Sequence, residues 1–186
     1  MKKNPNRIPF SPAAIDTDAI VAETTSNMVL HCWACVIGAI MDFSDTTTNS
    51  ILRLWNDANK YSLSVSQSAN ATWNAELKTV EKMVGLKPVS VPNPHSIRSV
   101  GDFNRFKRRV NQKALYSGLA LMMKPLIDAG YSDEYLRCVV DKAYGIDESI
   151  LKNQLSIAEI NEALADEYRL MLVQENGMTH IVELSK

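Results

Sequence analysis

The 186-residue sequence lacks the motifs of the common enzyme classes. It contains no GxSxG nucleophile motif, no P-loop, no HExxH metalloprotease motif and no glycine-rich dinucleotide-binding turn. Neighbouring carboxylates such as Asp147 and Glu148 would point to different faces of a helix, so they would make poor acid–base partners. We therefore expect a protein that is not an enzyme and that uses no cofactor.

Long hydrophobic runs are also absent. The longest, residues 28–41, is interrupted by His31 and is too short to cross a bilayer. The basic amino terminus, MKKNPNRIPFSP, is not followed by the apolar core of a signal peptide. The cysteines number three, which agrees with a reducing compartment. These features predict a cytoplasmic protein without membrane contact.

Glycine and proline are scarce, with seven of each, which favours long helices over a strand-rich fold. Apolar residues recur at helical spacing through most of the chain. Ser11 and Pro12 are suited to start the first helix, and Ser156 with Glu159 forms a capping box. The predicted helices cover residues 12–41 (with a division near 24–27), 50–61, 71–84, 102–129, 133–144 and a segment from 157 onward.

Proline and glycine also mark two non-helical segments. The segment LKPVSVPNPHS has three prolines within residues 88–94, and we interpret it as a semi-rigid connector. Near the end, Asn176 and Gly177 separate two alternating apolar runs, which is typical of a β-hairpin; the alternative is a helix that stops at Gly177. The predicted fold class is mainly α, a compact multi-helix bundle with a small C-terminal β-hairpin. The predicted units are an N-terminal helical unit (1–86), the connector (87–95) and a C-terminal helical unit (96–186).

The segment HCWAC, residues 31–35, most resembles a chemical site. Its CxxC spacing could serve a redox pair or half of a zinc site. However, a structural zinc site normally draws four ligands from two paired motifs, and the chain has one pair. The pair also lies within an apolar helical run, and cysteine commonly packs as a small buried residue. We therefore predict that Cys32 and Cys35 belong to the core and that the protein binds no metal.

Charge is distributed unevenly along the chain. From Arg98 to Lys113 there are six basic residues and one acid, whereas residues 133–186 carry eleven acids and five bases. A basic helical face with this composition is typical of phosphate contact, and the alternative is a solvated face whose arginines pair with acids of the C-terminal half. The predicted nucleic-acid-binding residues are Arg105, Lys107, Arg108, Arg109, Gln112 and Lys113.

The segment PLIDAGYSDEYLRCVVDKAYG resembles a helix-turn-helix, with Gly130 at the turn. Its second helix departs from that pattern because it begins with acids and offers only Arg137 and Lys142 to a DNA groove. A plain αα-hairpin has the same signature. A DNA-binding transcriptional regulator is therefore the alternative functional hypothesis.

The N-terminal half, with VLHCWACVIGAIMDF, TTTNSILRLWNDANKY and ELKTVEKMVG, resembles small helical accessory proteins of phages and prophages of Gram-positive bacteria. Some of these are anti-CRISPR proteins that inhibit Cas9. The resemblance implies a binding protein in a bacterial host, with a Cas9-type ribonucleoprotein or another host nuclease complex as its partner. Such a target offers both nucleic acid and positively charged channels. Asp133, Glu134 and Asp141 are the residues we expect to contact the protein partner, and we also expect a homodimer.

Overall fold

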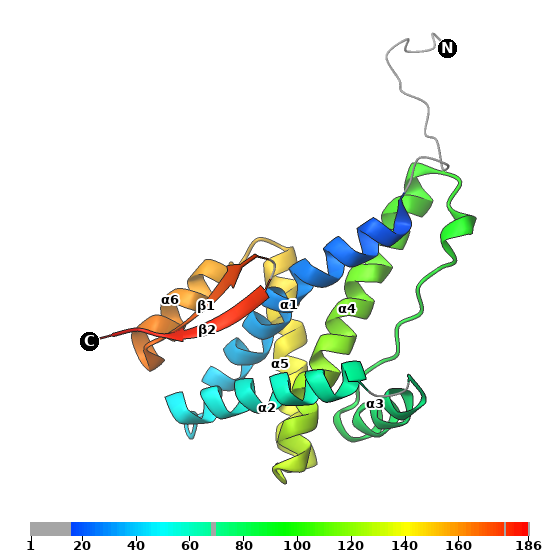
Figure 1. The fold of residues 1–186 in the computed structure, drawn as a ribbon. Coiled ribbons are helices and arrows are strands. Elements are labelled where there is room, and N and C mark those ends of the chain that lie inside the picture. Colours follow the sequence, from blue (N-terminus) through cyan, green and yellow to red (C-terminus); the bar gives the residue numbers. More distant parts are fainter. Residues whose placement is uncertain (1–15, 68–69, 177, 186) are drawn as a thin grey trace.

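The computed structural model describes residues 16–67, 70–176 and 178–185. These residues form six α-helices, one short 3-10 helix and one antiparallel pair of strands (Figure 1). The mainly α class and the C-terminal hairpin are thus confirmed. The elements are α1 (Thr17–Met41), α2 (Thr48–Gln67), α3 (Asn70–Val84), η2 (Pro94–Ser96), α4 (Val100–Asp128), α5 (Asp133–Leu151), α6 (Ile157–Tyr168), β1 (Leu170–Glu175) and β2 (Met178–Glu183).

Helix α1 is the centre of the fold. It packs against α4 and α5 and also contacts α6 and β1 (Figure 1). Its apolar run is buried from Cys32 to Ile37, and the ring of Trp33 lies 4.3 Å, centroid to centroid, from that of Trp55 in α2. One hydrophobic cluster includes side chains of all six helices and β1. The segments before and after the proline-rich connector therefore contribute to the same core.

A second, smaller cluster joins the outer ends of α1 and α4. Ile97, Phe106 and Val110 are buried there, and Ile20 and Phe103 pack against them. In Figure 1 these ends project together away from the remaining helices, beside the end of the connector. This cluster fixes the orientation of the first turns of α4, which carry the arginines.

Helix α1 has no division near residues 24–27, so that prediction was wrong. Asp16 is its N-cap and accepts a hydrogen bond from the Ala19 N–H at 2.9 Å. The helix start predicted at Ser11 and Pro12 lies outside the described residues. The predicted end of the second helix at residue 61 was also wrong, because α2 continues through the serines there to Gln67. The Ser64 hydroxyl donates to the Tyr61 carbonyl at 2.7 Å, which satisfies this polar group within the helix.

The ends of α4 and α5 also differ from the sequence prediction. Helix α4 begins at Val100, two residues before the predicted start at residue 102. Ser99 is its N-cap, and the Asp102 carboxylate accepts from the Ser99 hydroxyl at 2.8 Å. Helix α5 passes through Gly145 and ends at Leu151. Its last turns pack Ile146 and Ile150 against the main core, which offsets the low helix propensity of glycine. The capping box at the start of α6 is confirmed.

The strands β1 and β2 pair from Leu170 opposite Glu183 to Glu175 opposite Met178, so the alternative of a helix ending at Gly177 was wrong. Asn176 has a φ of 52°, the left-handed conformation that a tight hairpin turn requires. Leu170 and Leu172 of β1 are buried in the main hydrophobic cluster.

Within the described residues, α1 is the one helix long and apolar enough to cross a membrane by length and composition. Our expectation that the apolar run was too short rested on residues 28–41, and the helix is longer than that run. Half of its most apolar window is buried inside the fold, as in a core helix of a globular protein. The cytoplasmic location stays a prediction.

Candidate functional site

The first turns of α4 present a basic face, defined here by Arg105, Arg108, Arg109 and Gln112. These residues occupy positions i, i+3, i+4 and i+7, which lie on one side of a helix, and all four are exposed. Phe106, one residue after Arg105, turns away from this face and is buried in the second cluster. The guanidinium Nη1 of Arg109 donates to the Gln112 side-chain oxygen at 3.2 Å.

The arginines of the basic face are not neutralised by the acidic C-terminal half. Arg105 has an acidic neighbour in its own helix, Asp102, at 3.8 Å between side-chain nitrogen and oxygen; the Arg105 side chain is largely exposed and that of Asp102 is about one-third exposed. Across the described residues, no acidic group lies within ion-pair distance of Arg108 or Arg109. In this fold, therefore, these arginines do not form ion pairs with acids of the C-terminal half.

The two lysines predicted with these arginines lie apart from the basic face. The Lys107 ammonium is 5.8 Å from the centre of the Phe103 ring and borders a small hollow shared with α1. The Lys113 side chain is half-buried, and its ammonium lies 4.5 Å from the centre of the Tyr116 ring. Lys107 is two residues from both Arg105 and Arg109, so helical spacing itself places it off the basic face. Lys113 is set apart because the packing of α1 and α4 half-buries it.

Lys113 lines an apolar cavity of about 480 Å³ between α1, α2, α4 and the connector. Trp33, Val110 and Leu121 are among its walls, and Lys113 is the one charged residue among the described residues that line it. The sequence did not indicate this cavity, because its walls come from four segments that are far apart along the chain.

The acids predicted to contact a protein partner lie on the exposed side of α5. Asp133, Glu134 and Asp141 border a shallow hollow that they share with Arg137 and Lys142. The Arg137 Nε donates to the Met83 carbonyl of α3 at 3.1 Å, and the Lys142 ammonium forms an ion pair with Asp42. The two basic residues that a helix-turn-helix would offer to DNA thus make contacts within the protein.

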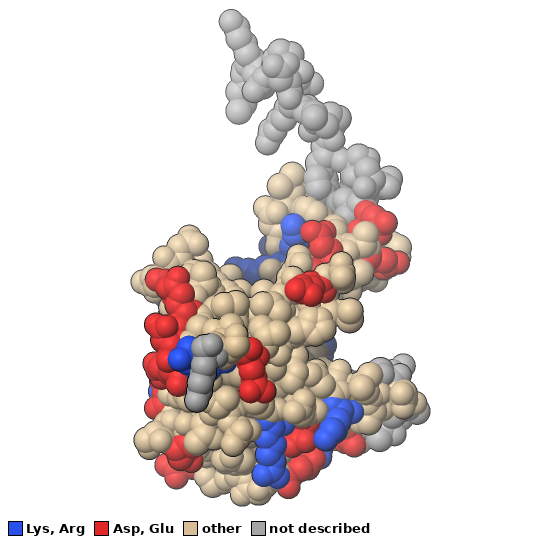
Figure 2. All heavy atoms as spheres, turned by 60° about the vertical axis from the view of Figure 1, so that its left-hand side comes forward, with Lys and Arg blue, Asp and Glu red and all other residues tan. Residues whose placement is uncertain are grey.

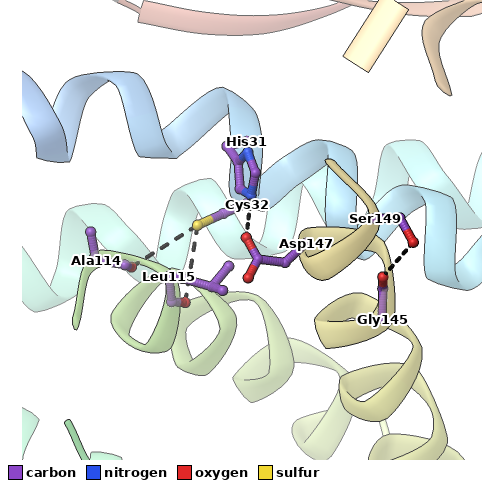
Figure 3. Close-up of polar contacts among 7 residues, drawn as sticks. All are labelled: His31, Cys32, Ala114, Leu115, Gly145, Asp147 and Ser149. Atoms are coloured by element: carbon purple, nitrogen blue, oxygen red, sulfur yellow. Dashed lines mark hydrogen bonds and ion pairs between the residues drawn. The ribbon is translucent and has the colours of Figure 1, made fainter. Parts of the chain in front are cut away.

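Cys32 and Cys35 are buried, as predicted. The Cys32 sulfur lies 4.0 Å from the carbonyl oxygens of Ala114 and Leu115 in α4 (Figure 3). Burial, and then the charge of Asp147, raises the pKa of the Cys32 thiol to about 12. Burial is also the main reason that the pKa of the Cys35 thiol is well above its ordinary value. Neither thiol has the exposure or the acidity of a redox-active cysteine.

The adjacent His31 makes the polar contact that the sequence did not predict. Its Nε2 lies 2.7 Å from the Asp147 Oδ1, so that α1 and α5 are joined by this pair (Figure 3). Cys35 is one helical turn beyond His31, and its sulfur completes a cluster with these two side chains. Asp147 follows His31 by 116 residues, and no spacing rule connects them.

Thiol reactivity tests this burial directly. We expect only Cys138, which is exposed, to react rapidly with an aromatic disulfide reagent at pH 8 in the native protein. A thiol with a pKa near 12 is ionised in only about one molecule in ten thousand at that pH, and burial also blocks access to it. Absorbance should report one rapid thiol per native chain and all three in denaturant, and Cys138→Ser should remove the rapid one. Three rapid thiols in the native protein would contradict the packing of α1.

No protein-family model, curated protein or solved structure matches this chain.

Proposed function

We propose that this protein is a non-catalytic binding protein that contacts nucleic-acid phosphates through the basic face of α4 and inhibits a host nucleic-acid-handling complex. The observation that carries the proposal is the exposed set of Arg105, Arg108 and Arg109, of which the last two have no acidic neighbour among the residues described. The second cluster holds the helix beneath them in a fixed orientation.

The chemistry of the basic face fits phosphate better than base recognition. Guanidinium groups form paired hydrogen bonds with phosphate oxygens, and neighbouring arginines on one helix face can contact successive phosphates. A protein reads nucleic-acid sequence through contacts, often bidentate, with base edges in a groove. Contacts between the arginines of the basic face and phosphates do not involve the base edges. We therefore expect binding with little sequence preference.

The choice of an inhibitor rests on the resemblance of the N-terminal half to phage accessory proteins, together with the charge distribution. The exposed acids of α5, Asp133, Glu134 and Asp141, could occupy a positively charged channel of a nuclease complex while the basic face contacts its nucleic acid. On the face in Figure 2, acidic side chains occur at several places and Lys and Arg form no continuous patch. A Cas9-type ribonucleoprotein is the partner that we propose to test first.

We do not favour the regulator hypothesis, because Arg137 and Lys142 are engaged with α3 and with Asp42. The buried side of the same helix, which includes Leu136 and Val140, belongs to the main core. The expected homodimer stays a prediction.

Two measurements on the wild-type chain test the proposed function. Fluorescence anisotropy should show binding to short DNA and RNA probes, with an affinity that falls about 40-fold between about 50 and 200 mM salt if three phosphates are contacted. An excess of the protein should block target cleavage by a reconstituted Cas9–guide complex. Absence of probe binding at low salt would refute the role of the basic face, and unimpaired cleavage would refute Cas9 as the partner.

A further inference from the structure

Three side chains with different metal-binding atoms converge between α1 and α5. His31 and Cys35 are four residues apart, so both lie on the side of α1 that faces α5, where Asp147 is located. A nitrogen of His31, the sulfur of Cys35 and a carboxylate oxygen of Asp147 all lie within 4.8 Å of one another. Figure 3 shows His31 and Asp147 pointing toward one another from the two helices.

We infer that His31, Cys35 and Asp147 form a binding site for one zinc-like divalent cation, with a fourth position for water. Nitrogen, thiolate and carboxylate together are a donor set that zinc accepts, and three protein ligands leave one tetrahedral position open. This differs from the zinc site that the CxxC pair suggested, because Cys32 is not a ligand. The expectation of no metal assumed that ligands must come from paired motifs, and Asp147 supplies the missing ligand from another helix.

The geometry requires only side-chain adjustment. Zinc–ligand bonds of about 2.0–2.3 Å at tetrahedral angles place ligand atoms about 3.4–3.7 Å apart. The His31 nitrogen and Asp147 oxygen, now 2.7 Å apart, would separate slightly as the ion replaces their hydrogen bond, and the Cys35 sulfur would approach. All three residues lie within helices, so the backbone positions are fixed by packing that is already present.

The charges also favour a cation. On binding, the Cys35 thiol would lose its proton to solvent, and its thiolate with the Asp147 carboxylate would balance the two positive charges of the ion. The relative exposures of the His31 and Asp147 side chains are 13% and 19%, which leaves the outer side of the cluster accessible to the ion and to water.

Cobalt(II) is the probe for this site, because it replaces zinc and reports its ligands through absorption. The untagged, chelator-treated chain should bind one equivalent of cobalt with a thiolate-to-metal band and the visible spectrum of a tetrahedral site. Zinc should displace the cobalt. Zinc at about 100 times its Kd should also raise Tm by about 5–10 °C.

Matched variants distinguish this site from incidental binding. Cys35→Ser should remove the thiolate band, whereas Cys32→Ser and Cys138→Ser should retain it. Asp147→Asn and His31→Gln should each weaken cobalt binding more than about 100-fold, since loss of an outer-shell partner alone costs about 10–100-fold. Both of these residues are partly exposed, so their variants keep the test valid if Cys35→Ser fails to fold. Absence of cobalt binding, a spectrum without the thiolate band, or affinity unchanged in Asp147→Asn and His31→Gln would overturn the inference.

Discussion

Replacement of Arg105 and Arg109 by glutamate is expected to weaken the binding of a nucleic-acid probe by about 100-fold or more at low salt. A hydrogen bond between charged groups contributes about 1.5–3 kcal/mol, so the loss of two such contacts removes about 3 kcal/mol or more of binding free energy. The new carboxylates would also repel phosphate. The slope of log K against log salt should fall from about −2.7 to weaker than −1, because each lost phosphate contact changes it by about 0.9. Anisotropy titrations at several salt concentrations measure both quantities.

A charge-matched control is available on α2. Arg53 and Lys60 are highly exposed and both lie near Asp57, with side-chain nitrogen–oxygen distances of 3.7 and 3.8 Å. Their replacement by glutamate changes the net charge by the same amount as the α4 variant does, and we expect it to alter probe affinity by less than about threefold. Circular dichroism should show both variants folded. Equal losses in the two variants would mean that overall charge, and not the basic face, governs binding.

The helices could be predicted from the sequence because the signals that define them are local. Apolar residues at helical spacing indicated where the helices lie, and the capping box of Ser156 and Glu159 was identified from neighbouring residues alone. The errors arose where tertiary packing overrides local preference. Gly145 lies inside α5 because the next turn packs against the core, and the polar residues at 24–27 lie inside α1.

In the candidate site too, local features could be predicted from the sequence and tertiary contacts could not. Arg105, Arg108 and Arg109 share a face because of helical spacing, so the sequence could group them correctly. The burial of Lys113 beside the apolar cavity and the approach of Asp147 to His31 both result from helices that meet in three dimensions. No spacing along one segment contains that information.

Replacement of Gly118 by valine is expected to lower the free energy of unfolding by about 3 kcal/mol and Tm by about 6–12 °C. Gly118 lies where α4 crosses α1, and a Cβ at this position would be 2.6 Å from the Cys32 sulfur and 3.1 Å from its Cβ. The two helices must therefore separate, which would weaken the packing of α1 along the main core. Urea denaturation followed by circular dichroism measures the change.

Gly145→Val is the matched control for this prediction, because a Cβ at Gly145, which is also inside a helix, would meet no atom within 4 Å. Valine has a higher helix propensity than glycine, so we expect this variant to be as stable as wild type or slightly more stable. Cys32→Ala removes the sulfur that obstructs Gly118→Val, and the double variant should regain about 1 kcal/mol or more relative to the single valine variant, a coupling that a double-mutant cycle detects. If Gly118→Val and Gly145→Val have equal stabilities, or if Cys32→Ala restores nothing, the close contact between α1 and α4 at this position does not exist in solution.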